Sequence, residues 1–206
     1  MTPRVTIVTT VFERVDCLRR CLRSVQKLKY RDIEQIVVSD SPPDEIVVEI
    51  AALCESFGVT HYNMYHRAND WGISPAMAGL RASLGEFVCF LSDDNAYLPD
   101  HFGPLVAAFD ADPGLGFVYS SCLYAGHKEL RQAPPAGAGI DLGQPLFRRA
   151  LLKEHFNDVL PCRGAFSWDW ELISALMRLG VRWQHVDETT FVFRLMAYPE
   201  LMAVLA

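Results

Sequence analysis

Two adjacent carboxylates and an amide follow a short apolar run in the middle of the chain. The run is Phe87 to Leu91, and after Ser92 come Asp93, Asp94 and Asn95. Carboxylate and amide oxygens are hard ligands suited to Mg²⁺ or Mn²⁺, and ligands collect at strand ends in open α/β sheets. Neighbouring anions repel, so both stay ionised only where a metal, donors or water offset their charge. The pattern therefore predicts a divalent-cation site. The alternative is a solvated acidic turn.

Further polar groups follow other predicted strands of the chain. Thr10 and Phe12 come after the first strand and Asp40 after the second, so in a parallel sheet they would share one edge with the acidic pair. The Asp40 carboxylate would accept a hydrogen bond from a base imide or a ribose hydroxyl, and Phe12 offers a face for a base. The alternative for Asp40 is a turn that hydrogen-bonds its own backbone.

Size and composition describe one folded domain that does not bind nucleic acid. The chain has 206 residues, of which 50% are hydrophobic, and a formal net charge of -6. No stripe of Lys and Arg offsets the acidic total, which argues against binding by broad phosphate neutralisation. No apolar run approaches the roughly 20 residues that span a bilayer, and no secretory signal is recognisable. We therefore expect a cytoplasmic protein without a transmembrane segment.

Strand-like and helix-like segments alternate through roughly the first 110 residues. This alternation requires crossover connections, so it predicts an α/β fold with a mostly parallel central sheet flanked by helices. The predicted strands are Val5–Thr10, Ile33–Ser39, Val59–Tyr65 and Phe87–Leu91. The predicted helices are Val15–Val25, Ile46–Phe57, Pro75–Leu84 and Phe102–Phe109.

The pattern changes after Pro113. Residues 132–143 are rich in Pro, Gly and Ala, which favours either a mobile loop over a site or an inert connection. Strands are predicted at Leu115–Leu123, Arg182–His185 and Thr189–Arg194, and helices at Leu146–His155 and Trp168–Leu179. One domain with a variable last third is the simplest division.

The usual motifs that bind phosphates through backbone amides are missing from the sequence. There is no Gly-x-Gly-x-x-Gly after the first strand and no Gly-Lys-Ser/Thr phosphate loop. A pyrophosphate bound at the predicted edge would need a metal to neutralise it. The acidic pair could bind that metal, so the need for a metal strengthens the prediction of a cation site at Asp93 and Asp94.

Five segments, in order along the chain, together resemble the family 2 inverting glycosyltransferases. They are Val5–Thr10, Val37–Asp40, Phe90–Asp100, Phe147–Arg149 and Trp168–Leu172. The resemblance covers about residues 4–195 and implies a single domain, residues 1–206, of the GT-A or nucleotide-diphospho-sugar transferase fold. Residues 1–112 would form its nucleotide-binding part and residues 113–206 its acceptor side. The metal loop is most similar to that of the spore-coat polysaccharide type.

The resemblance also implies roles for the nucleotide side. Thr10, Phe12 and Asp40 would hold the nucleobase, and Asp93 the ribose. Asp94, with Asn95 in the third position of the motif, would hold a Mn²⁺ or Mg²⁺ that bridges the diphosphate. Because a carboxylate at Asp40 suits an imide N–H donor, UDP or dTDP is the favoured carrier.

On the acceptor side, Asp169 matches the catalytic base of the family. It would take a proton from an acceptor hydroxyl as that oxygen attacks the anomeric carbon. Asp141 lies where the family has an acidic residue near the acceptor. Trp168 and Trp170 could stack on a sugar or pack inward, and Arg148 could approach the diphosphate or remain an exposed charge. Without the resemblance, helix capping would be the simpler role for Asp169.

Some positions depart from the family pattern. Phe12 is followed by Glu13 and Arg14 where the family usually has Asn after the aromatic residue. Asn95 occupies the third position of the family's Asp-x-Asp motif, so the metal would have one carboxylate fewer. Met196 stands where the family often has a His. The chain ends soon after, so the acceptor side is expected to be open or completed by another subunit, in a homodimer or with a partner protein.

The sequence therefore predicts a metal-dependent inverting glycosyltransferase. Its partners would be a nucleoside-diphosphate sugar and a hydroxyl-bearing saccharide or small molecule. One alternative is a partner subunit that binds nucleotide-sugar without turnover. Another is a nucleotidyltransferase, against which the absence of a Gly-rich basic first loop speaks.

Overall fold

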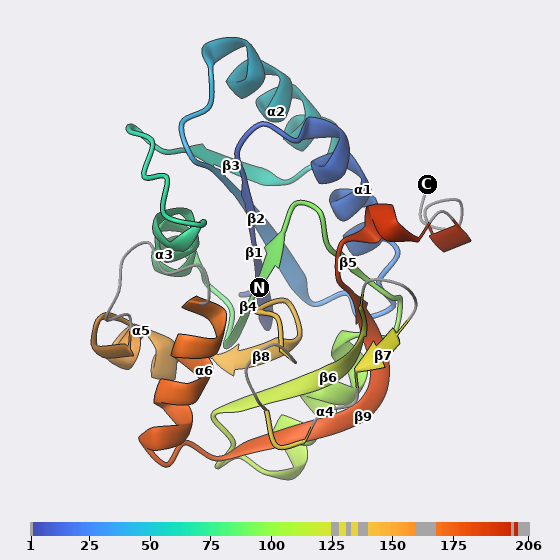
Figure 1. The fold of residues 1–206 in the computed structure, drawn as a ribbon, viewed down its shortest axis with the longest axis vertical. Coiled ribbons are helices and arrows are strands. Elements are labelled where there is room, and N and C mark those ends of the chain that lie inside the picture. The colour runs from blue at the N-terminus through green and yellow to red at the C-terminus, as the bar shows by residue number, and fades with distance from the viewer. Residues whose placement is uncertain are drawn as a thin grey trace.

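Strand and helix alternate through the first half of the chain, and the strands pair in parallel (Figure 1). The computed structural model describes residues 2–124, 128–130, 133–135, 140–159, 168–198 and 200–201. The parallel strands are β1 (Val5–Val11), β2 (Ile33–Ser39), β3 (Thr60–Asn63) and β4 (Phe87–Ser92). They lie in the order β3-β2-β1-β4. The strands predicted for this region are confirmed, apart from small shifts at their ends.

Helices cover both faces of this parallel part. They are α1 (Val15–Gln26), α2 (Asp44–Phe57), α3 (Ile73–Ala82) and α4 (Phe102–Ala111). Successive residues of β1 point to opposite faces, so Ile7 shares a core with α1 and α4, whereas Val8 shares one with α3. The buried residues Leu18, Leu22 and Val25 of α1 lie three or four positions apart, as the predicted amphipathic helix requires. Among the described helices, none is both long and apolar enough to cross a membrane.

The remaining strands extend the sheet in mixed directions. β8 (Pro145–Arg148) runs antiparallel to both β4 and β6 (Phe117–Tyr124), and β9 (Trp183–Val192) runs parallel to β6. The short strands β5 (Ala96–Tyr97) and β7 (Lys128–Leu130) pair antiparallel with β9 and β6. The helices α5 (Arg149–Val159) and α6 (Trp168–Arg178) share a core with α3, and the short helix η1 (Leu195–Ala197) follows β9. The predicted α/β class is confirmed.

Two predictions for the last third are wrong. The helix predicted over Leu146–His155 begins only at Arg149, because the preceding residues form β8 between β4 and β6. A short apolar run fits a strand or a buried helix, and the neighbouring strands decide between them. The two strands predicted after residue 181 are one strand, β9, whose pairing with β6 is irregular opposite Ser120 and Ser121. The predicted loop at residues 132–143 lies partly outside the described residues.

The carboxyl ends of β1, β2 and β4 meet at one edge of the sheet. Thr10 pairs with Ser92, and the backbone N–H of Asp93 donates to the carbonyl oxygen of Thr10 at 3.2 Å. The N–H of Asp40 donates to the carbonyl oxygen of Val11 at 3.0 Å. Parallel pairing in register therefore places the residues after these three strands side by side, as predicted.

Candidate active site

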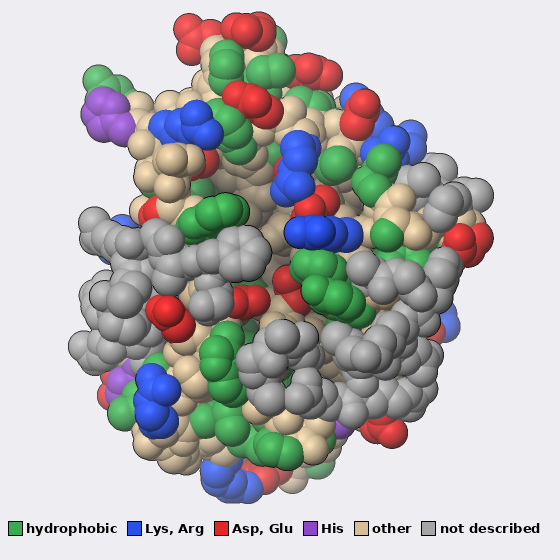
Figure 2. Space-filling view, viewed as in Figure 1, with side chains coloured by type: hydrophobic (Ala, Val, Ile, Leu, Met, Phe, Trp, Pro, Cys, Tyr) green, Lys and Arg blue, Asp and Glu red, His purple; other side chains and the backbone are tan. Residues whose placement is uncertain are grey.

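A cleft of about 930 Å³ lies at this edge and is bounded on the other side by the start of α6. In Figure 2, acidic and basic side chains lie close together near the centre of the face shown. Ten of the residues predicted to form the site line the cleft: Thr10, Phe12, Asp40, Asp93, Asp94, Asn95, Asp141, Trp168, Asp169 and Trp170. The structure thus brings together residues from β1, β2, β4 and α6 that are far apart in sequence.

Arg14, directly before α1, bridges the two adjacent carboxylates. Its Nη1 lies 2.6 Å from Asp94 Oδ2, its Nε lies 3.1 Å from Asp93 Oδ2, and its Nη2 also donates to Asp93 Oδ1. The Asp93 side chain is only 2% exposed, compared with 20% for Asp94. Burial raises the pKa of Asp93 to about 6, although the Arg14 guanidinium acts in the opposite direction. The repulsion expected between the two acids is thus offset by a cation of the chain itself.

The acidic pair suits a divalent cation that a ligand helps to coordinate. Asp93 and Asp94 present hard oxygen ligands that already converge on one positive group. Among the described residues, no cluster of three or more His, Cys, Asp or Glu side chains is arranged to hold a metal ion. Mg²⁺ and similar ions are often held by one or two carboxylates together with substrate phosphates. The donor set therefore fits a cation shared with a bound diphosphate.

The Asn95 side chain forms hydrogen bonds with two other segments of the protein, at Asp141 and Arg194. Its side chain is buried, with Oδ1 accepting a 2.9 Å hydrogen bond from the backbone N–H of Arg194. Its Nδ2 donates to Asp141 Oδ1 at 3.3 Å. The sequence predicts that Asn95 contributes to the metal site. In the structure both ends of its amide are hydrogen-bonded, to Asp141 and to the backbone after β9.

The other end of the cleft contains Asp40 and Phe12. Asp40 accepts hydrogen bonds from the backbone N–H groups of Ala68 at 2.7 Å and Asn69 at 3.0 Å. Its partners therefore belong to the loop between β3 and α3 rather than to its own turn. The guanidinium of Arg67, from the same loop, lies 3.8 Å from the centre of the Phe12 ring. This contact shows that the exposed face of Phe12 accepts a flat, delocalised group.

The two tryptophans at the start of α6 pack inward as well as lining the cleft. Trp168 is 9% exposed and meets the ring of Phe90 edge-on, with centroids 6.2 Å apart. Its Nε1 donates to the carbonyl oxygen of Trp71 at 3.1 Å, which ties α6 to the loop before α3. Trp170 is partly buried against the same core. For Trp168 the inward alternative is thus confirmed.

Asp169 and Asp141 add two more carboxyl groups to the cleft. Asp169 Oδ1 accepts a 2.7 Å hydrogen bond from the N–H of Trp170, and burial raises the pKa of Asp169. Burial likewise raises the pKa of Asp141 to about 7, with a hydrogen bond from Gly143 opposing the shift and the charges of Asp169 and Asp94 reinforcing it. Asp141 therefore lies within electrostatic reach of both the acidic pair and the start of α6.

We predict that Asp141→Asn stabilises the nucleotide-free protein at pH 8. The native pKa of Asp141 is raised from 3.8 to about 7, so at pH 8 the folded state holds an ionised carboxyl that its buried site disfavours. The contribution of Asp141 to the free energy of unfolding is fully present below about pH 4 and is lost as pH rises through the folded pKa. Asn keeps the acceptor for Gly143 and Asn95 and carries no charge, so the variant should melt about 4 °C higher at pH 8. Equal melting temperatures at pH 8, or a larger gain at pH 5, would contradict this assignment.

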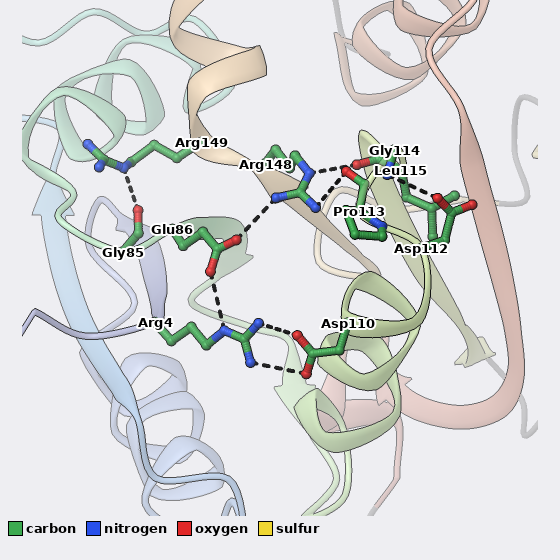
Figure 3. Close-up of polar contacts among 10 residues, drawn as sticks. All are labelled: Arg4, Gly85, Glu86, Asp110, Asp112, Pro113, Gly114, Leu115, Arg148 and Arg149. Atoms are coloured by element: carbon green, nitrogen blue, oxygen red, sulfur yellow. Dashed lines mark hydrogen bonds and ion pairs between the residues drawn. The ribbon is translucent and has the colours of Figure 1, made fainter.

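Arg148 does not line the cleft. Its Nη1 lies 3.1 Å from Glu86 Oε1, and its Nε and Nη2 donate to the carbonyl oxygens of Leu115 and Pro113 (Figure 3). Glu86 also pairs with Arg4, at 3.3 Å. Arg148 pairs with Phe87, the first residue of β4, at the opposite end of that strand from the acidic pair. The predicted approach of Arg148 to a diphosphate is therefore wrong. Because β8 runs antiparallel to β4, Arg148 lies at the end of β4 that is far from the cleft.

Sequence reasoning missed several polar residues that line the cleft, among them Arg14, Arg67, Gln144 and Arg194. Arg14 follows β1 and would have been found by extending the strand-end rule by two residues. Gln144 accepts from the N–H of Asp141 at 2.7 Å and donates to the carbonyl oxygen of Ser120 at 2.8 Å. Arg67 and Arg194 follow β3 and β9, where no sequence pattern indicated a site.

Comparison with known proteins gives a consistent result at the level of family. The model of the family described as "Glycosyl transferase family 2" matches residues 6–168. A GalNAc(5)-diNAcBac-PP-undecaprenol beta-1,3-glucosyltransferase of Campylobacter jejuni is 23% identical over 75% of this chain and 49% of its own length. The putative glycosyltransferase EpsH of Bacillus subtilis is 29% identical over 94% of this chain and 56% of its own. The chain thus spans about half the length of these curated relatives. They are diverse bacterial proteins rather than representatives of the spore-coat type.

Solved structures confirm the GT-A fold. TarS 1-349 of S. aureus, solved in complex with UDP, has a TM-score of 0.73 and 15% identity, covering 98% of this chain and 65% of its own. The mannosyltransferase PcManGT of Pyrobaculum calidifontis, in complex with GDP-Man and Mn²⁺, has a TM-score of 0.73 and 19% identity. That match covers 95% of this chain and 58% of the other. At this identity the likeness concerns the fold alone.

Proposed function

Because the chain belongs to glycosyl transferase family 2, we propose that it moves a sugar from a nucleoside-diphosphate sugar to a hydroxyl acceptor, with inversion at the anomeric carbon. The observation that carries this proposal is the cleft itself. It is lined by Asp93 and Asp94 at the end of β4 and by Asp169 at the start of α6. Residues 1–112 would mainly bind the nucleotide, and residues 113–206 would form the acceptor side, where a saccharide or small molecule supplies the hydroxyl.

The nucleotide would lie along the ends of β1, β2 and β4. Thr10, Phe12 and Asp40 surround the part of the cleft nearest β2, and Phe12 presents a ring on which a base can stack in place of Arg67. The Asp40 carboxylate is oriented by Ala68 and Asn69 and suits an N–H donor of the base. Asp93 would then hold the ribose. A uracil or thymine carrier fits this arrangement.

Asp94, with Asp93 beside it, would hold Mn²⁺ or Mg²⁺ together with the diphosphate. When bound, such an ion supplies positive charge opposite the negative charge that develops on the departing diphosphate. PcManGT contains GDP-Man and Mn²⁺ in a similar fold, which supports this part of the proposal.

Asp169 would act as the general base. The acceptor oxygen forms a bond to the anomeric carbon as the bond between that carbon and the diphosphate oxygen breaks, and the electron pair leaves with the diphosphate. The acceptor proton passes to Asp169, so no covalent intermediate on the protein is needed. Asp141 would stay close to the acceptor, held by Asn95 and by the N–H of Gly143.

We expect UDP and dTDP to raise the melting temperature more than CDP does, and Mn²⁺ to enlarge the effect. The imide N–H of uracil or thymine can donate to Asp40, whereas the ring N3 of cytosine carries no hydrogen. The measurement is a thermal-shift screen of nucleoside diphosphates and their sugars, with Mn²⁺ or with chelator. Preferential stabilisation by CDP would contradict the role of Asp40. Binding of UDP-sugars without transfer to any acceptor or to water would favour a partner subunit that has no turnover.

A further inference from the structure

We infer that Arg14 is an internal counter-cation that keeps divalent cations off the Asp93–Asp94 pair until a nucleoside diphosphate binds. The inference rests on the proposed function, because it concerns the metal ligands assigned there. It gives a role to a residue to which neither the sequence pattern nor the family comparison assigned one. Arg14 would thereby make metal binding depend on the nucleotide.

The guanidinium occupies the oxygens that a metal would need. It uses three nitrogens to contact three carboxylate oxygens, both of Asp93 and Oδ2 of Asp94. Bidentate pairs of this kind are among the stronger and more directional charge-assisted hydrogen bonds. A divalent cation on the same oxygens would have to displace at least part of this contact. It would also lie next to the positive charge of Arg14.

The guanidinium is the part of this cluster that can leave. The Arg14 side chain is 55% exposed, whereas the side chain of Asp93 is 2% exposed and that of Asp94 is 20% exposed. The backbone of Arg14 is held at the start of α1, where its carbonyl oxygen accepts the N–H of Leu18 at 3.0 Å. The long side chain can therefore turn within the cleft without unfolding the helix.

A bound diphosphate would change the competition between the Arg14 guanidinium and a divalent cation for the carboxylates of Asp93 and Asp94. It brings negative charge into the same cleft, and a guanidinium pairs well with phosphate oxygens. The carboxylates are then free for a metal that the phosphates also coordinate. Without the diphosphate, a guanidinium that leaves Asp93 and Asp94 has no phosphate to replace these carboxylates as its partner. Metal and nucleotide are therefore expected to bind with positive coupling that depends on Arg14.

The test is calorimetric titration of Mn²⁺ at pH 8, with and without UDP, on the wild type, R14Q, R14K and R19Q. Without UDP, R14Q should bind Mn²⁺ about tenfold more tightly than the wild type, and the enhancement of Mn²⁺ affinity by UDP should shrink about tenfold. R14K keeps the positive charge and should stay within about threefold of the wild type. R19Q is the matched control, since it removes one positive charge from α1 at a residue that does not line the cleft.

Two results would overturn the inference. One is an R14Q variant whose Mn²⁺ affinity without UDP equals that of the wild type. The other is an R19Q variant that gains as much affinity as R14Q, which would reduce the effect to net charge. Adding Asp94→Ala separates this inference from the proposed function. If Asp94→Ala binds Mn²⁺ normally with UDP, the metal site itself is misplaced; if it does not, an unchanged R14Q rejects the Arg14 inference alone.

Discussion

Replacing Asp169 with Asn should lower the turnover number by about 10²- to 10⁴-fold, the usual contribution of a general base. Asn has nearly the same shape but cannot accept the proton of the attacking hydroxyl. Its Oδ1 can still accept the hydrogen bond that Asp169 takes from Trp170 at 2.7 Å, so α6 should begin unchanged. The donor dissociation constant should change less than about twofold, because the residues proposed to bind the nucleotide lie at the ends of β1, β2 and β4, away from α6.

The measurement is release of nucleoside diphosphate from the best donor of the thermal-shift screen, together with calorimetric donor binding. Glu171→Gln is a matched control in the first turn of the same helix, at a residue that does not line the cleft. It should retain turnover within a few-fold once its melting temperature shows that it is folded. An Asp169→Asn variant with normal turnover would remove Asp169 from the mechanism.

Replacing Asp94 with Ala should reduce turnover by about 10²- to 10³-fold, the range found when one group that stabilises a developing anion is removed. Asp94 is the more exposed acid of the pair, so it is the carboxylate that would be more accessible to a divalent cation. The variant should bind UDP with the same affinity in Mn²⁺ as in chelator. The wild type should bind UDP more tightly in Mn²⁺.

Asp100→Ala provides the comparison for this variant. Asp100 belongs to the same segment, but its carboxylate pairs with Lys29 at 2.8 Å on the surface and does not line the cleft. Exposed pairs of this kind contribute little to stability, so this variant should retain both activity and Mn²⁺ dependence. Full activity of the wild type in excess chelator would reject the metal role of Asp94, whatever the variants show.

The carboxyl groups changed in these two predictions, Asp169 and Asp94, are coupled through Asp141. Asp141 responds to the charges of Asp94 and Asp169, and its carboxyl is hydrogen-bonded to Asn95 from the acidic loop. Asn95 in turn accepts the N–H of Arg194 from the segment after β9. The proposed donor side and acceptor side are therefore joined by direct hydrogen bonds. A substitution at Asn95 would disturb both sides at once, so it is less informative than either single carboxylate.

The order of strands and helices in the parallel half, and with it the position of most of the cleft, follows from residue patterns along the chain. β-branched runs that alternate with amphipathic segments require crossovers, and crossovers place the ends of parallel strands at one edge. Thr10, Asp40 and Asp93 could therefore be assigned to one site from spacing alone. The acceptor side, including Asp169, came from the resemblance to a family rather than from any local rule.

The pairing of side chains within and beyond that cleft is visible only in the folded protein. Arg14 meets Asp93 across 79 positions of sequence, and Asn95 reaches the backbone of Arg194 across 99. Arg148 was misplaced because its segment is drawn into the sheet as β8, antiparallel to β4, rather than continuing as a helix. Local propensity and periodicity contain no information on these contacts, since each depends on the packing of several elements that are distant along the chain.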